Sequence, residues 1–273
     1  MRLPSWFIGE FTGTFLLVFF GCGSVCLAVL TGALVGVFQV ALVWGLGVAI
    51  AIYLTAGLSG AHLNPAVTVA LAVWEGFPPK RILPYVLAQM LGAFVAAAVL
   101  FVIFQTPLIA YETAHQIVRG APGSEATAMV FGEFFPNPGG LPLTEIDRLR
   151  ISHFGAFIAE VVGTAVLLFV VGYLSDQRRR SLPRAWVAVA IGLTLTLLIC
   201  VFGPLTMACF NPARDLAPRF FSALVGWGSV PFTVNGAGWL TVYVLAPLCG
   251  GILGAGAYRR FDKRHFLEAL KKD

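Results

Sequence analysis

Long, uninterrupted apolar stretches dominate this chain, and its charged residues collect in the segments between them. A membrane-spanning helix needs roughly 20 apolar residues, and six stretches reach or approach that length. They are Phe7–Val29, Val37–Leu58, Ile82–Phe104, Phe154–Tyr173, Trp186–Phe202 and Leu240–Tyr258. Two further apolar segments, Pro65–Trp74 and Pro212–Leu224, are too short to cross a bilayer. The pattern predicts an all-α membrane protein with six transmembrane helices and two half-helices.

Each short segment begins at the same tripeptide, Asn-Pro-Ala, first at Asn64 and again at Asn211. Asn can cap the free N–H groups at a helix N-terminus, and Pro fits the first helical position because its missing N–H is not needed there. The motifs therefore predict helices that start inside the membrane. Two such helices at corresponding places in two halves of a chain point to a shared site at the midplane.

The two halves of the chain form an inverted repeat. Glu10 and Glu160 open matching Glu-x-x-Gly-Thr sequences, and Asn64 and Asn211 lie 147 positions apart. Each repeat holds three spans, which is an odd number, so the second repeat must enter the membrane from the opposite side. We therefore expect the two half-helices to meet tip to tip.

We expect a single channel domain over residues 1–273, a right-handed helix bundle around a central pore. The first repeat covers about residues 6–105 and the second about 152–260, followed by a tail at 261–273. The loop between the repeats, about 106–151, is rich in Gly, Pro and acidic residues. It is too long to be only a connection, so we expect part of it to fold over the pore entrance.

Composition supports the membrane assignment, because 58% of the residues are hydrophobic and only 11% are charged, against about a quarter charged in soluble domains. The net charge of +5 does not indicate nucleic-acid binding, because the basic residues gather on one side of the predicted membrane. That side carries Arg2, Lys80, Arg81, Arg178–Arg180, Arg184, Arg259, Arg260, Lys263, Arg264, Lys271 and Lys272. The opposite side carries only Arg119, Arg148 and Arg150.

This charge distribution places both termini in the cytoplasm and predicts a multi-pass protein of the cell (cytoplasmic or inner) membrane. The run Arg178–Arg180 is interpreted as a topology anchor, with a lipid-headgroup or regulatory site as the alternative. The five cysteines lie in apolar stretches without metal-like spacing, so we expect packing residues and no disulfide framework. No metal ion and no cofactor is expected.

The backbone before each Asn-Pro-Ala motif is the predicted pore lining, because non-helical backbone at membrane depth occurs where it lines a cavity or is buried in protein. Its carbonyl oxygens belong to Gly60, Ala61 and His62 and to Met207, Ala208 and Cys209. Asn64 and Asn211 would accept a backbone N–H with their side-chain oxygen and aim their amide N–H groups at the lumen. Acceptors on one wall, donors at the centre and apolar residues elsewhere suit small uncharged molecules. The positive ends of two facing half-helices, each about half an elementary charge, repel cations.

Four of the charged residues within the predicted membrane region are candidates for a specific role. Arg214 is badly placed for the dipole of its half-helix, which favours a functional role facing the pore over an ion pair with Asp215. Asp215 would then bind N–H groups of the helix start or of a loop. Glu10 and Glu160 are predicted to accept N–H groups from the irregular segments, with proton relay as the alternative.

The chain resembles the aquaporin superfamily (major intrinsic proteins) over essentially its whole length, and specifically the glycerol-facilitator branch. The motifs that carry the resemblance are Ser59–Thr68, His115–Gly120, Gly203–Thr206 and Asn211–Asp215. Five positions that separate glycerol channels from water channels in this family are of the glycerol type here: Phe104, Asp215, Arg219, Pro247 and Leu248. The resemblance also implies a homotetramer with one pore per subunit.

By the same resemblance, the outer constriction is formed by Trp44, Ile199, Ala208 and Arg214. A bacterial glycerol facilitator typically has Gly at position 199 and Phe at position 208. In this chain the larger of the two side chains is at position 199 and the smaller is at position 208. This set is similar to that of plant nodulin-26-like channels, which pass glycerol and water.

We therefore predict a passive channel for glycerol and other small uncharged solutes, with some water, that excludes ions and protons. One alternative is a nodulin-26-like channel whose main substrate is water, urea, ammonia, an undissociated acid or a metalloid hydroxide. A second alternative is an ion-coupled secondary transporter, for which only Glu10 and Glu160 offer an ion site. Enzyme activity is not expected: the Gly-x-Ser-Gly string at 57–60 would make an intramembrane protease only with a suitably placed helical His, which the sequence lacks.

Overall fold

The computed structural model describes residues 3–176 and 183–269. Within these residues the chain is helical, and six helices are long and apolar enough to cross a membrane. Five are α1 (Ser5–Thr31), α2 (Val37–Ser59), α4 (Ile82–Ala114, after the 3-10 turn η1, Pro79–Arg81), α7 (His153–Ser175) and α8 (Arg184–Thr206). The sixth is built from α11 (Gly238–Leu240), the π-helical turn η4 (Thr241–Leu245) and α12 (Ala246–Ala269). The predicted six-span, all-α fold is confirmed.

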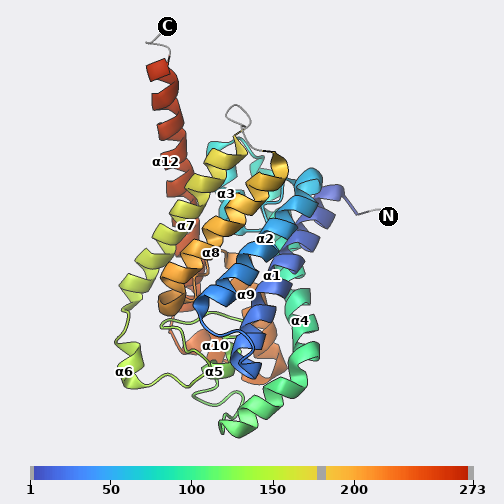
Figure 1. The fold of residues 1–273 in the computed structure, drawn as a ribbon, viewed down its shortest axis with the longest axis vertical. Coiled ribbons are helices and arrows are strands. Elements are labelled where there is room, and N and C mark those ends of the chain that lie inside the picture. The colour runs from blue at the N-terminus through green and yellow to red at the C-terminus, as the bar shows by residue number, and fades with distance from the viewer. Residues whose placement is uncertain (1–2, 177–182, 270–273) are drawn as a thin grey trace.

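The two short helices α3 (Pro65–Trp74) and α9 (Pro212–Ser222) connect the two halves of the bundle. In the first half α1 packs on α2 and α4, and in the second half α7 packs on α8 and α12 in the same way. Helix α3 packs on α12, whereas α9 packs on α4, so each half-helix is inserted into the opposite half. Figure 1 shows α3 near the end of the bundle at which α1 begins and α12 ends.

The halves also meet where α2 crosses α8, at Gly45 and Gly192. A Cβ atom added to Gly45 would lie 2.4 Å from the carbonyl oxygen of Gly192, and one added to Gly192 would lie 2.2 Å from that of Gly45. Only glycine permits this approach of two helix backbones. The crossing brings α2 and α8 to the same lumen.

Several helices end at other residues than the sequence predicts: α8 continues to Thr206 and α12 to Ala269, and α4 and α9 differ as well. Helix α4 does not stop near Phe104 but continues through Pro107 to Ala114. Its last turns are stabilised by tertiary contacts, because Glu112 forms a salt bridge of 2.8 Å with Arg119 and the Tyr111 hydroxyl donates to the carbonyl of Gly140. Helix α9 ends at Ser222 and is followed by the π-helical turn η3 (Ala223–Trp227) rather than running to Leu224.

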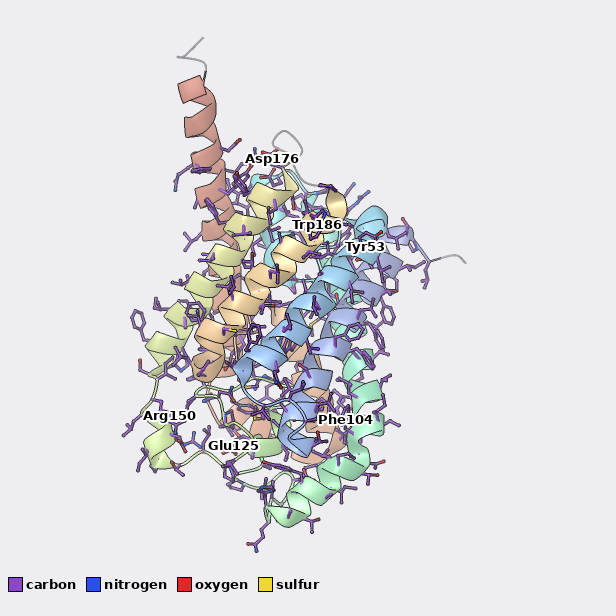
Figure 2. The ribbon with its side chains drawn as sticks, viewed as in Figure 1. Tyr53, Phe104, Glu125, Arg150, Asp176 and Trp186 are labelled. Carbon is purple, nitrogen blue, oxygen red and sulfur yellow. The ribbon has the colours of Figure 1, made fainter. Side chains whose placement is uncertain are left out.

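The loop between the repeats contains two single-turn helices, α5 (Glu125–Ala128) and α6 (Glu145–Arg148), and lies at the opposite end from the two chain ends (Figure 1). Residues 124–136 are all buried, so this part of the loop is packed into the molecule and not draped over it. Figure 2 shows Glu125 and Arg150 at this end and Tyr53, Asp176 and Trp186 at the other. The loop packs with another short helix, α10 (Val230–Thr233). The predicted anchor run Arg178–Arg180 lies outside the described residues.

Candidate functional site

Two cavities meet inside the bundle. The larger, about 1190 Å³, extends from the end of the bundle with the chain termini, near Tyr53 and Asp176, past both half-helix tips to Arg214. The smaller, about 580 Å³, opens on the side of the long loop, where Tyr111 and Asn137 line it. Trp44, Ile199 and Arg214 line both cavities. The two cavities therefore adjoin at three of the four residues predicted to form the constriction, and the fourth, Ala208, lines the larger one.

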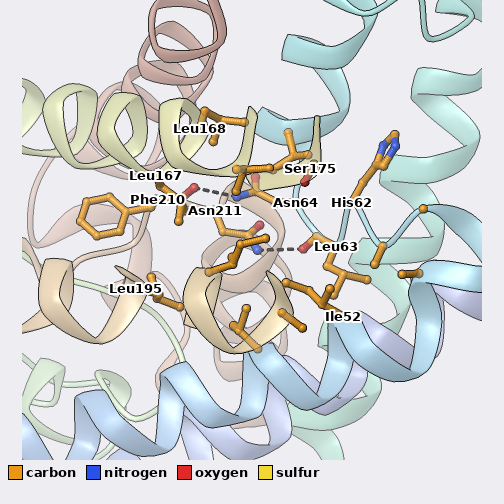
Figure 3. A pocket seen from close by; sticks show the side chains of 18 of the residues that line it. Ile52, His62, Leu63, Asn64, Leu167, Leu168, Ser175, Leu195, Phe210 and Asn211 are labelled. Atoms are coloured by element: carbon orange, nitrogen blue, oxygen red, sulfur yellow. Dashed lines mark hydrogen bonds between the residues drawn. The ribbon is translucent and has the colours of Figure 1, made fainter. Parts of the chain in front are cut away.

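The tips of α3 and α9 meet in the larger cavity through a reciprocal pair of hydrogen bonds (Figure 3). The Asn64 Nδ2 atom donates to the carbonyl oxygen of Phe210 at 2.8 Å, and the Asn211 Nδ2 atom donates to that of Leu63 at 2.8 Å. Each Asn also caps its own helix, because its Oδ1 accepts the N–H of Ala66 or Ala213.

Contrary to the sequence prediction, the amide groups of Asn64 and Asn211 do not face the lumen with all their N–H groups. An Asn amide carries two N–H donors, and in each repeat one of them binds the carbonyl of the opposite repeat. One N–H per asparagine is left for the lumen. The carbonyls of Leu63 and Phe210, which the sequence analysis did not single out, are the partners, because each directly precedes an asparagine at the tip.

The backbone leading to each tip has an unusual conformation that repeats between the halves. Ala61 and Leu63 have φ near +50°, and so do their counterparts Ala208 and Phe210, with φ of 61° and 51°. The left-handed conformation costs a non-glycine residue roughly 1–2 kcal/mol. These segments persist because the surrounding structure fixes them.

Two buried carboxylates provide that fixation. The Glu10 carboxylate accepts the N–H groups of His62 and Leu63 at 2.9 and 2.8 Å. Glu160 does the same at the equivalent place, accepting those of Cys209 and Phe210 at 3.0 and 2.8 Å. Because the N–H groups of these segments point toward the carboxylates, their carbonyl groups point away from the carboxylates.

Five of the six residues predicted to offer carbonyl oxygens line the larger cavity: Gly60, Ala61, His62, Ala208 and Cys209. Within the described residues, no N–H or O–H group donates to any of these carbonyl oxygens. Met207 lines the smaller cavity instead, and its thioether sulfur accepts the N–H of Phe134 at 3.3 Å. The thiol of Cys209 faces away from the row of carbonyls, toward the carbonyl oxygens of Asn211 and Tyr243.

Arg214 lies at the junction of the cavities and is only 5% exposed. Its guanidinium Cζ atom lies 4.1 Å from the ring centroid of Trp44, and its Nη2 atom lies 2.7 Å from the carboxylate of Glu133. The structure thus pairs Arg214 with a residue of the long loop and not with Asp215. Sequence reasoning missed Glu133, because nothing in a loop sequence shows which helix its side chain will meet.

Asp215 instead joins α9 to the loop. Its carboxylate accepts the N–H of Glu133 at 2.7 Å and forms a salt bridge of 2.8 Å with Arg219. The Arg219 guanidinium in turn donates to the carbonyls of Glu133 and Pro231. Two buried arginines and two buried carboxylates therefore fix the loop against α9.

A second buried side chain that the sequence analysis missed is Gln89, whose Nε2 donates to Glu10 at 2.7 Å and to Thr68 at 3.0 Å. The sequence does contain a signal for Gln89, because it is a polar residue in the middle of the apolar span Ile82–Phe104. Among the described residues, no group of three or more His, Cys, Asp or Glu side chains is arranged to hold a metal ion.

The chain is similar to known proteins over most of its length. The sequence model of the major intrinsic protein family matches residues 3–258. The glycerol uptake facilitator protein of Haemophilus influenzae is 42% identical over 255 residues, covering 93% of this chain and 92% of that protein. The glycerol uptake facilitator protein of Pseudomonas aeruginosa is 41% identical over 271 residues, covering 97% and 92%.

A solved structure is similar as well. The aquaglyceroporin from Plasmodium falciparum superposes with a TM-score of 0.78 at 29% sequence identity, covering 93% of this chain and 94% of that one. The similarity to these proteins spans both repeats, both half-helices and the loop between them.

Proposed function

The chain belongs to the major intrinsic protein family, and on that premise we propose that it is a passive channel for glycerol and other small uncharged solutes, with some passage of water. Family membership supports a transport protein rather than an enzyme. The names of its relatives and the lining of its lumen both support glycerol as the main substrate.

The observation that carries the proposal is that five residues line a largely apolar lumen and that, within the described residues, their carbonyl oxygens accept no hydrogen bond. A triol that enters a narrow passage must shed water, and each hydroxyl hydrogen bond left unmade costs on the order of 2–7 kcal/mol. The carbonyls of residues 60–62 and 208–209 accept hydrogen bonds from the solute hydroxyls in turn, and Arg214 and the remaining amide N–H groups of Asn64 and Asn211 donate hydrogen bonds to them. Trp44, Ile52, Leu167 and Leu195 offer the carbon skeleton an apolar wall.

Ions lack such a replacement for their hydration shells, which supports their exclusion. The N-termini of α3 and α9 face each other at the centre of the lumen, and each contributes about half a positive elementary charge. A cation, including hydronium, therefore meets a repulsive midplane.

We place both chain termini in the cytoplasm of a cell (cytoplasmic or inner) membrane. Helix α1 begins and helix α12 ends at the same end of the bundle (Figure 1). Arg259 and Arg260 belong to α12, and Lys80 and Arg81 belong to the turn η1 that follows α3. Basic residues favour the cytoplasmic side. By analogy with the family, the chain forms a homotetramer in the lipid bilayer, with one pore per subunit.

Stopped-flow light scattering on proteoliposomes tests the proposed function. Glycerol, urea and sucrose gradients are applied, and water permeability is measured with the impermeant sucrose. We expect glycerol flux that is proportional to the gradient and insensitive to a protonophore. A protonophore-sensitive or gradient-independent flux would instead identify an ion-coupled transporter.

The same vesicles distinguish the nodulin-26-like alternative, which the small Ala208 and bulky Ile199 keep open. In that case water, urea, ammonia, an undissociated acid or a metalloid hydroxide crosses faster than glycerol. Vesicles that pass none of these solutes faster than protein-free vesicles would contradict the channel assignment.

A further inference from the structure

The indole of Trp44 lies flat against the backbone of α1 at Gly21. A Cβ atom added to Gly21 would lie 2.2 Å from two ring carbons of Trp44 and 2.3 Å from a third. Carbon atoms in contact are about 3.5–4.0 Å apart, so a side chain at position 21 and the present position of the ring are incompatible. The absent side chain creates the recess that the ring occupies.

Arg214 also packs on the indole ring. The guanidinium Cζ atom lies 4.1 Å from the ring centroid, and the arginine is itself held by Glu133. Because Trp44 and Arg214 both line the two cavities, the depth of the recess at Gly21 decides how far the indole and the stacked guanidinium reach into the constriction.

Helices α1 and α2 cannot separate to make room for a larger residue at position 21. Their interface is just as close at other places: a Cβ added to Gly13 would lie 2.8 Å from the Thr55 Oγ1 atom, and one added to Gly47 would lie 2.8 Å from the Phe20 Cβ atom. A displacement of α1 at Gly21 would have to open these contacts as well. A side chain at position 21 would therefore displace the indole of Trp44. The free space next to the indole is the lumen, so the indole would move in that direction.

The repeat supplies an internal comparison. The position equivalent to Trp44 in the second repeat is Ile191, 147 residues later, and the position equivalent to Gly21 is Val171, 150 residues later. Where the lumen residue has no ring, a β-branched side chain stands in place of the glycine. Of these two equivalent positions, only the one in the repeat with Trp at the lumen position is a glycine.

We propose that Gly21 is a specificity-determining residue that acts through Trp44: its missing side chain sets the width of the constriction and admits solutes with the cross-section of a carbon chain. Gly21 does not itself touch the solute. This inference rests on the proposed function for its substrate, but the packing relation behind it does not.

The test compares Gly21→Ala with Gly23→Ala in proteoliposomes. Gly23 is a matched control on the same helix, because a Cβ there would only reach a leucine methyl at 3.4 Å. Overpacking at Gly21 raises the barrier for a solute that fills the constriction, so we expect glycerol permeability to fall about tenfold or more. Water, which is smaller, is expected to fall much less, so the glycerol-to-water ratio drops in Gly21→Ala and stays at the wild-type value in Gly23→Ala.

A double-mutant cycle with Trp44→Ile distinguishes the proposed mechanism from general destabilisation. Without the indole, the added methyl group meets no ring, so Gly21→Ala/Trp44→Ile should have the same permeability ratio as Trp44→Ile alone. A merely misfolded variant would lose water and glycerol flux in proportion, leaving the ratio unchanged. An unchanged ratio in well-folded Gly21→Ala, or an equal drop of the ratio in both backgrounds, overturns the proposal.

Two further outcomes are informative. If Gly21→Ala does not fold, the proposal still requires the double variant to fold as well as Trp44→Ile, and its failure to do so counts against the proposal. If wild-type vesicles pass no glycerol, the proposed function fails. The indole position in an experimental structure of Gly21→Ala then tests the packing relation: displacement of the indole away from position 21 supports it, and an unmoved indole overturns it.

Discussion

The side-chain amide of Asn64 donates a hydrogen bond of 2.8 Å to the carbonyl oxygen of Phe210, a residue 146 positions away at the tip of the other half-helix. Asn211 returns the same bond to Leu63. Each asparagine therefore performs two tasks with one side chain: its oxygen caps its own helix, and its nitrogen binds the opposite repeat. The amide donors and carbonyl acceptors at the two half-helix tips therefore satisfy each other in the interior of the bundle, away from bulk water.

Removing the tip contact should destabilise the protein in two separable steps. Asn64→Ala loses the cap, worth about 1 kcal/mol, and leaves the Phe210 carbonyl without its partner, at about 1–3 kcal/mol. Asn64→Ser keeps a capping oxygen but does not reach Phe210. We expect unfolding temperatures in detergent to decrease from wild type to Asn64→Ser to Asn64→Ala. Equal stability of the two variants would mean that the Asn64 oxygen contributes no cap.

Glu160→Gln should be strongly destabilising, because the amide offers one acceptor oxygen where the carboxylate offers two, and its NH₂ group faces a backbone N–H. Hydrogen bonds to charged groups are worth about 1.5–3 kcal/mol each, so we expect a loss of about 2–3 kcal/mol in unfolding free energy. Glu145→Gln, at an exposed loop position, is the control. A stable Glu160→Gln protein whose solute flux has become insensitive to a proton gradient would support the proton-relay alternative.

The Arg214–Glu133 pair predicts that Arg214→Val alone is unstable. Removing one partner of a buried ion pair costs about 3–5 kcal/mol, because the other charge is left uncompensated. Arg214→Val/Glu133→Gln should recover part of this loss. We expect the double variant to pass larger polyols than wild type in the same stopped-flow assay. A double variant as unstable as the sum of the two single variants would show that the pair is not coupled.

Changing the opposite walls of the constriction should change its selectivity. Ile199→His adds a polar ring where the two cavities adjoin, and Ala208→Thr adds bulk and a hydroxyl in the larger cavity. We expect the glycerol-to-water permeability ratio to fall, because the narrower and more polar ring favours the smaller solute. An unchanged ratio would mean that the limiting constriction lies elsewhere in the lumen.

Local signals in the sequence were sufficient for the elements of this fold. Apolar runs of spanning length predicted the six helices, because a bilayer leaves few other ways to satisfy a backbone. Asn followed by Pro predicted the starts of α3 and α9 to the residue, because capping is decided within one turn of helix. The odd number of spans in each repeat predicted the inversion, and with it the meeting of the half-helix tips.

What depended on contacts between distant segments was decided only by the tertiary structure. Helix α4 runs past Phe104 because Glu112 and Tyr111 find partners in the loop. Glu133 reaches Arg214 because residues 124–136 are buried against α9. The asparagine amides bind Phe210 and Leu63 because two repeats bring their tips together. Each of these contacts joins groups that are far apart along the chain, so its partner is fixed by the packing of the bundle and not by any local preference.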